Sequence, residues 1–230
     1  MFIPFYDTEP NRYGSFPFVT VGLIATNVAV FILELFWVAR DPLLIYKFGS
    51  TPAIVLEGTG PAAVATITHM FLHGGFSHIF FNMLALWVFG RRVEDACGPL
   101  RFLFYYLLCG VGADILSTIV RSFLDPSIPG IGASGAIYGV MGAYLVLFPE
   151  GRIRTFLLVW VVPMWPKIRA LWVVIVFVGL QLFSAYWTMT GQSDGRVNYF
   201  AHIGGFLGAL FIHFFLRPEA FARYMSDVGV

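Results

Sequence analysis

Apolar residues run through this chain in long segments that short polar connections interrupt. Six segments approach the length that a helix needs to cross a bilayer, which is ~20 residues. They are approximately residues 16–38, 76–89, 102–120, 132–148, 170–188 and 199–216. We expect the shorter ones to be shielded by protein, because a lipid-facing helix would need the full thickness. The pattern predicts an all-α membrane protein, a bundle with six transmembrane helices.

Two connections between these segments are themselves apolar. The first, residues 39–75, contains three prolines but is too apolar for a solvated linker, and we expect short amphipathic helices associated with the membrane. The second, residues 156–165, is too short to cross the bilayer and is bounded by basic residues. We expect an interfacial or re-entrant loop there.

Composition supports the membrane assignment. The chain is 58% hydrophobic and only 12% charged, far from the average of a soluble domain. A net charge of +1 with scattered basic residues gives no reason to expect nucleic acid as a partner. The two cysteines match neither a disulfide framework nor a metal site. We therefore expect the chain to lie in a lipid bilayer.

Basic residues are distributed unevenly between the two sides that six crossings would define. One side, with the N-terminal tail (1–15), the second and fourth connections and the C-terminal tail (217–230), carries ten Lys and Arg, and the other side carries four. The positive-inside rule then predicts cytoplasmic termini, with residues 39–75 forming a long external loop. Residues 16–216 are expected to form one domain, in a prokaryotic plasma membrane.

Four polar residues fall at one predicted depth on three spans. His78 and Asn82, Ser134, and His202 each lie in the first turns of a span that enters from the external side. Each could hydrogen-bond between helices as a structural contact. Polar groups at membrane depth are costly, however, and four at one level favour a functional site.

The spacing suggests how these four residues could react together. Glycines beside Ser134 and His202 allow close helix contact, although glycines four apart also serve simple packing. Contact would let the histidine take the serine proton. His78 and Asn82 project from one helical face and could donate hydrogen bonds to an oxyanion.

Three separated segments are similar to motifs of the rhomboid family of intramembrane serine proteases. They are GASGAIYG at 132–139, HMFLHGGFSHIFFN at 69–82 and AHIGGFLG at 201–208. The resemblance implies that Ser134 is the nucleophile and His202 the general base, a dyad without a carboxylate. It also implies an oxyanion hole made of His78, Asn82 and the backbone N–H of Ser134, with Tyr138 packed against the His202 ring.

The resemblance also implies supporting roles. His69 and His73 would brace the first loop, and Glu94 would anchor Arg91 or a loop amide. The other supporting positions are Gly132, Gly135 and Gly205. Many rhomboids carry a Trp-Arg pair where this chain has Val64 and Ala65, so the anchoring of the first loop must differ. Asp114, in the third span, has no assigned role, structural or functional.

The sequence therefore predicts an intramembrane serine endopeptidase that cleaves transmembrane segments of membrane proteins near the external face. No metal and no cofactor are expected. The external loop 190–196 is expected to act as a mobile cap. A catalytically silent rhomboid-like protein that binds membrane clients is the alternative. A small transporter is less favoured, because the polar groups gather near one face.

Overall fold

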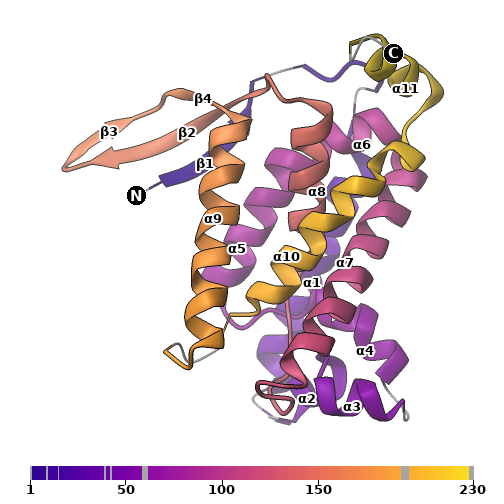
Figure 1. The fold of residues 1–230 in the computed structure, drawn as a ribbon, viewed down its shortest axis with the longest axis vertical. Helices are drawn as coiled ribbons and strands as arrows, with labels where there is room; N and C mark the ends of the chain where they lie inside the picture. Colours follow the sequence, from indigo (N-terminus) through magenta and orange to yellow (C-terminus); the bar gives the residue numbers. More distant parts are fainter. Residues whose placement is uncertain are drawn as a thin grey trace.

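A computed structural model gives the fold of residues 2–8, 10–14, 16–38, 40–41, 43–58, 62–192 and 197–227. Its long helices run alongside one another and form a bundle (Figure 1). α5 (Phe76–Ala85) continues through a π-helical turn, η2 (Leu86–Gly90), into α6 (Arg91–Cys97). α10 (Tyr199–Leu207) continues into a 3₁₀ helix, η3 (Gly208–Phe215). The other long helices are α1 (Phe18–Val38), α7 (Pro99–Arg121), α8 (Ser134–Leu147) and α9 (Ala170–Met189).

Helices thus occupy each of the six apolar segments. By length and composition, α1, α7 and α9 could each cross a membrane, and up to five spans result if two bent helix pairs are counted as well. α8, with 14 residues, is shorter than these. Six crossings therefore stay a prediction for the described part of the chain.

α8 is the central helix of the bundle. Every residue from Gly135 to Tyr144 is buried, and α8 contacts α6, α7, α9 and α10. A Cβ on Gly205 would overlap the carbonyl of Gly135, and one on Gly139 would lie 2.5 Å from Sγ of Cys109. Because these glycines lack side chains, α7 and α10 approach α8 closely. This approach brings α10 beside the first turn of α8.

The described residues of the first apolar connection contain four short helices, which lie at one end of the bundle, the lower end in Figure 1. They are α2 (Leu44–Phe48), α3 (Pro52–Glu57), α4 (Ala62–Thr68) and the 3₁₀ helix η1 (His69–Phe71). Backbone bonds join Ser50 to Gly130 in both directions, at 3.0 and 2.7 Å. The connection is therefore tied to the segment that leads into α8, while its association with the membrane stays a prediction.

The apolar run at 156–165 forms a β-hairpin instead of an irregular loop, and its interfacial or re-entrant position stays a prediction. β2 (Arg152–Val159) pairs with β3 (Val162–Met164) and β4 (Lys167–Arg169). It also pairs antiparallel with β1 (Phe2–Asp7), with Phe2 opposite Leu157. Backbone groups in the run are thereby satisfied by neighbouring strands. The partner β1 lies about 150 residues away along the chain, where no local pattern could reveal it.

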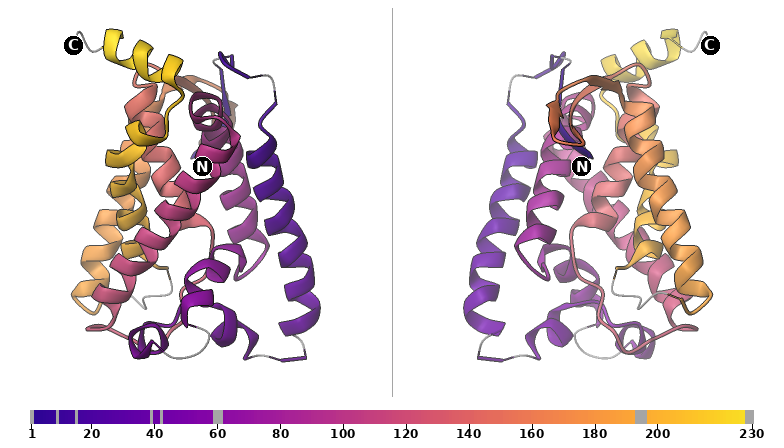
Figure 2. Two further views of the ribbon diagram at one scale, coloured as in Figure 1. Left: turned by 90° about the vertical axis from the view of Figure 1, so that its right-hand side faces the viewer. Right: turned by 90° about the vertical axis from the view of Figure 1, so that its left-hand side faces the viewer.

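The C-terminal segment forms α11 (Pro218–Asp227), which is bent by 106° from the preceding helix. Figure 2 shows α11 running outward across the end of the bundle that also carries the sheet. The short helices of the first connection lie at the opposite end. The two ends therefore differ in architecture.

Candidate active site

Ser134 and His202 are in direct contact. Ser134 begins α8, His202 lies in the first turns of α10, and the Ser134 hydroxyl donates to Nε2 of His202 at 2.7 Å. The close packing of Gly135 against Gly205 sets this distance, because a side chain on Gly205 would push the helices apart. His202 is buried and Ser134 is half-buried. A hydroxyl and an imidazole at this distance can exchange a proton.

The other nitrogen of His202 contacts a residue that the sequence did not single out. Nδ1 of His202 lies 2.6 Å from Oε1 of Gln181, which projects from α9. An amide oxygen can only accept, so Nδ1 carries the proton and Nε2 presents its lone pair to Ser134. The ring of Tyr138 stacks on the imidazole with centroids 4.5 Å apart and planes 12° apart. His202 is thus held at both nitrogens and on one face.

His78 and Asn82 lie against the loop that leads into Ser134. A Cβ on Gly132 would be 2.8 Å from Nε2 of His78 and 3.7 Å from Nδ2 of Asn82. Nδ1 of His78 accepts from the backbone N–H of Gly74 at 3.2 Å, which leaves Nε2 as the donor. Nδ2 of Asn82 is buried and has no hydrogen-bond partner among the described residues. Two side-chain N–H donors therefore lie beside the segment that leads into the N-terminus of α8.

Gly132 is needed at its position for two reasons. Its φ of +119° lies in a region that residues with side chains rarely adopt. The space that a side chain would need is taken by the ring of His78. The Gly132 N–H donates to the carbonyl of His69 at 2.8 Å, which fixes the loop before Ser134.

His69 and His73 make different contacts. Nδ1–H of His69 donates to the carbonyl of Ala65 at 2.9 Å. The backbone N–H of His73 donates to the carboxylate of Glu34 at 3.0 Å, and its ring packs against the ring of His78 with centroids 5.0 Å apart. Both ring nitrogens of His73 are buried without a hydrogen-bond partner among the described residues. Backbone hydrogen bonds of His69 with Gly132 and of Ser50 with Gly130 attach the first connection to the segment before α8. These bonds anchor the connection in a chain that lacks the Trp-Arg pair.

Glu94 lies far from this site, at the other end of the bundle. Its carboxylate accepts from the backbone N–H groups of Val19 and Thr20 at 2.9 and 2.7 Å, and from the Thr20 hydroxyl at 2.7 Å. Glu94 therefore joins α6 to the first turn of α1. Arg91 instead donates to the carbonyl of Asp7 at 2.5 Å.

Asp114 is buried on α7, and His69 and Arg121 are its basic neighbours. Neither neighbour adjoins it in sequence, which is why the sequence suggested no partner. Within the described residues, no three His, Cys, Asp or Glu side chains are grouped to hold a metal ion. Residues 193–196 of the expected cap lie outside the described residues, so the cap stays a prediction.

Comparison with known proteins identifies the family. A family model described as the Rhomboid domain matches residues 62–219. The chain belongs to the rhomboid family. Family membership together with the long apolar helices makes this rhomboid an integral membrane protein.

Several curated relatives of this rhomboid cover most of its length. The mitochondrial Rhomboid protein 1 of Saccharomyces cerevisiae is 30% identical over 212 residues, which cover 90% of this chain and 54% of the yeast protein. Rhomboid protease GluP of Bacillus subtilis is 33% identical over 197 residues, 85% of this chain and 34% of the relative. The human mitochondrial presenilin-associated rhomboid-like protein is 34% identical over 141 residues, 60% of this chain and 35% of the relative.

This rhomboid spans about a third to a half of the length of these relatives. They come from a bacterium and from mitochondria. A prokaryotic plasma membrane therefore stays a prediction for this chain.

Proposed function

We propose that this rhomboid is an intramembrane serine endopeptidase in which Ser134 and His202 act as a catalytic dyad. The observation that carries the proposal is the 2.7 Å contact between Ser134 Oγ and His202 Nε2. A relative of this chain is named a rhomboid protease, which agrees with the proposed reaction class. The domain that carries the activity is proposed to be residues 16–216, since Glu94 joins α1 to the helices that the family model covers.

In the first half of the reaction, Ser134 Oγ attacks the carbonyl carbon of the scissile peptide bond while His202 Nε2 takes the hydroxyl proton. The tetrahedral intermediate then collapses, the carbon–nitrogen bond breaks, and His202 gives its proton to the leaving amine. The product is an acyl ester on Ser134. In the second half, His202 takes a proton from water, which attacks the ester. Cleavage of the ester releases the acid and returns the proton to Ser134.

Gln181 is proposed to hold His202 in the reactive tautomer. Its Oε1 lies 2.6 Å from Nδ1, so it accepts a hydrogen bond from Nδ1–H and leaves Nε2 free to act as the base. When the imidazole becomes an imidazolium, the same hydrogen bond gains charge assistance. Gln181 thus takes the orienting position that a carboxylate has in a triad, without bringing a charge into the bundle.

His78 and Asn82 are proposed to stabilise the negative oxygen of the tetrahedral intermediate. Both present N–H donors beside Gly132, two residues before the nucleophile. The backbone N–H of Ser134 lies in the first turn of α8, where helical N–H groups have no partner within the helix. It is proposed as the third donor. Because these donors are already in position, no free energy is needed to reorient them when the negative charge develops.

The proposed substrates are transmembrane segments of other membrane proteins, cleaved near the external face. With ten basic residues expected on one side of the membrane and four on the other, the end that carries α11 and the sheet is proposed to face the cytoplasm. A reporter fused after Val230 should then be active on the cytoplasmic side only. External activity would overturn this orientation and leave the dyad untouched.

The activity is tested with the full chain reconstituted in liposomes together with a model transmembrane substrate. The wild type should cleave the substrate and react with a fluorophosphonate probe. Ser134→Ala should do neither, whereas Ser127→Ala, which removes an exposed loop hydroxyl, should do both. A folded wild type that reacts with no probe and cleaves no substrate would refute the dyad and favour the silent client-binding alternative.

A further inference from the structure

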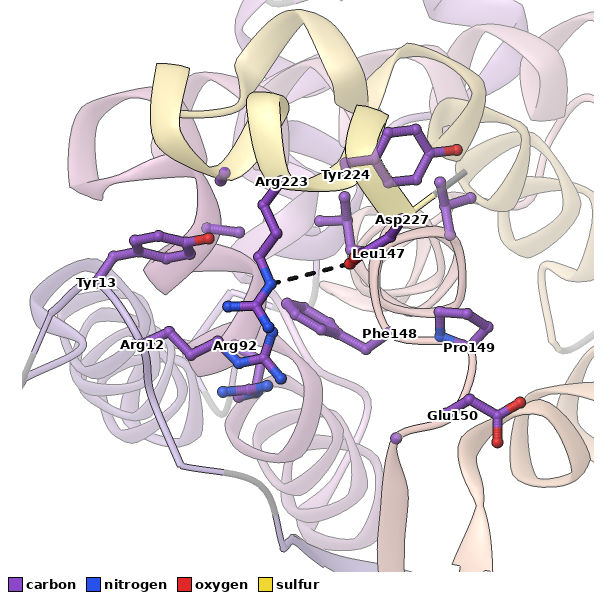
Figure 3. Close-up of a pocket in the computed structure, with 14 residues that line it drawn as sticks. Arg12, Tyr13, Arg92, Leu147, Phe148, Pro149, Glu150, Arg223, Tyr224 and Asp227 are labelled. Carbon is purple, nitrogen blue, oxygen red and sulfur yellow. Dashed lines mark ion pairs between the residues drawn. The ribbon is translucent and has the colours of Figure 1, made fainter. Parts of the chain in front are cut away.

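A second concave site lies at the end of the bundle opposite Ser134. It is a cavity of about 500 Å³ between the N-terminal segment, α6, the end of α8 and α11 (Figure 3). Phe148, which follows α8, lines it. The 14 residues of α8 rise ~1.5 Å each, so roughly 20 Å separate the cavity from the nucleophile. The proposed protease reaction makes no use of it.

Three arginines line this cavity, and they are held differently. Arg12, Arg92 and Arg223 direct their guanidinium groups toward the same part of the cavity in Figure 3. Arg92 is buried, pairs with the carboxylate of Asp7 at 3.1 Å and lies over the Phe148 ring at 4.5 Å. The charge of Arg92 is thus compensated, and its side chain forms one rigid wall of the cavity.

The other two arginines have little compensation. Among the described residues, the Arg12 side chain has no ion pair and no hydrogen bond. Arg223 pairs with Asp227 at 3.9 Å, and both side chains are more than half exposed. An ion pair that is so long and so exposed contributes little.

Asp227 also lines the cavity and, among the described residues, makes only the long, exposed pair with Arg223, while the other nearby carboxylates have other partners. Glu150, which lines the cavity, pairs with Arg169 at 2.9 Å. The Asp95 carboxylate accepts from the backbone N–H groups of Arg12, Tyr13 and Gly14 at 2.5–3.1 Å. The cavity therefore has a surplus of guanidinium groups, whose forked donors fit the oxygens of a phosphate group.

We propose that this cavity binds a phosphate-bearing anion through Arg12 and Arg223. The surroundings favour the headgroup of an anionic lipid as its source. α11 is bent by 106° across the bundle end and exposes Phe221, as expected for a helix lying at a membrane surface. Basic pockets at the cytoplasmic ends of membrane helices are suited to such headgroups. A free phosphate has the same chemistry, and the experiment below separates the two sources.

The test measures thermal unfolding of the detergent-solubilised full chain during titration with three compounds. They are short-chain phosphatidylglycerol, short-chain phosphatidylcholine and inorganic phosphate. Phosphatidylglycerol should raise the Tm saturably, and phosphatidylcholine, which has no net charge, should not. Stabilisation by inorganic phosphate alone would identify a free anion as the ligand, and stabilisation by phosphatidylglycerol alone would identify a lipid headgroup.

The arginines are tested by the double substitution Arg12→Gln/Arg223→Gln, which should weaken the apparent affinity at least about tenfold. Arg152→Gln/Arg154→Gln is the matched control, since both arginines are exposed on β2 at the same end of the molecule. Arg12→Gln alone is the second variant, because its side chain has no partner among the described residues and its unliganded Tm should not change.

Two outcomes would overturn the proposal. One is the absence of saturable stabilisation of the wild type by either anion. The other is an equal response of both double variants, which would indicate general attraction to a basic surface. Neither outcome depends on proteolysis, so this proposal and the protease assignment can fail separately.

Discussion

Replacing Gln181 by leucine removes the oxygen that lies 2.6 Å from Nδ1 of His202 and leaves a side chain of similar size. A hydrogen bond between neutral groups contributes ~0.5–1.5 kcal/mol, and one to a charged group ~1.5–3 kcal/mol. The imidazole is neutral in the resting enzyme and charged in the transition state. The transition state therefore loses about 1–2 kcal/mol more than the ground state, a ~5- to 30-fold fall in kcat.

The assay is steady-state cleavage of a model transmembrane substrate in liposomes, with the rate of fluorophosphonate labelling measured in parallel. Both kcat and the labelling rate should fall in Gln181→Leu, and KM should stay constant because Gln181 is not proposed to touch the substrate. Gln181→Glu keeps an acceptor at the same place and should retain more activity than Gln181→Leu. Ser127→Ala, at an exposed loop position outside the expected cap, is the control.

Two results would refute this reasoning about Gln181. An unchanged kcat in Gln181→Leu would show that the hydrogen bond does not position His202. Equal losses in Gln181→Leu and Gln181→Glu would show that the glutamine contributes by packing and not by accepting a hydrogen bond from Nδ1–H.

Three further predictions concern the dyad, the donors and the loop before the nucleophile. Ser134→Ala and His202→Ala should each abolish cleavage, and the double variant should be no less active than either single variant, since the pair acts as a unit. If both single variants kept some activity and their losses multiplied in the double variant, the dyad would be contradicted. Asn82→Ala and His78→Ala should each lower kcat by ~10²–10³ at nearly constant KM, and a rise in KM at constant kcat would assign that residue to substrate binding. Gly132→Ala should lower kcat and the Tm together, because its φ of +119° costs a side chain ~1–3 kcal/mol and the His78 ring must move; an unchanged Tm and kcat would show that the loop tolerates a side chain.

The pattern of apolar segments and the cost of burying polar groups in a membrane were enough to predict the main helices and the candidate site residues. Apolar segments mark helices because a chain in lipid must satisfy its backbone groups internally. The comparisons confirm the membership of the rhomboid family that three motifs indicated. Ser134 and His202 were predicted as site residues because a polar side chain in an apolar membrane helix is costly and therefore favours a functional role. Their roles stay predictions that the experiments above can decide.

Contacts between distant segments could be decided only by the tertiary structure. Gln181 is one glutamine in a long apolar segment, and nothing in its spacing indicates that α9 turns it toward His202. β1 pairs with β2 across about 150 residues, and the two β-strands satisfy each other's backbone where a loop was predicted. Glu94 meets the first turn of α1 although its neighbour Arg91 is the nearer partner in sequence. Sequence patterns report the local surroundings of each residue, whereas a hydrogen bond between helices depends on how their faces are rotated against each other in the packed bundle.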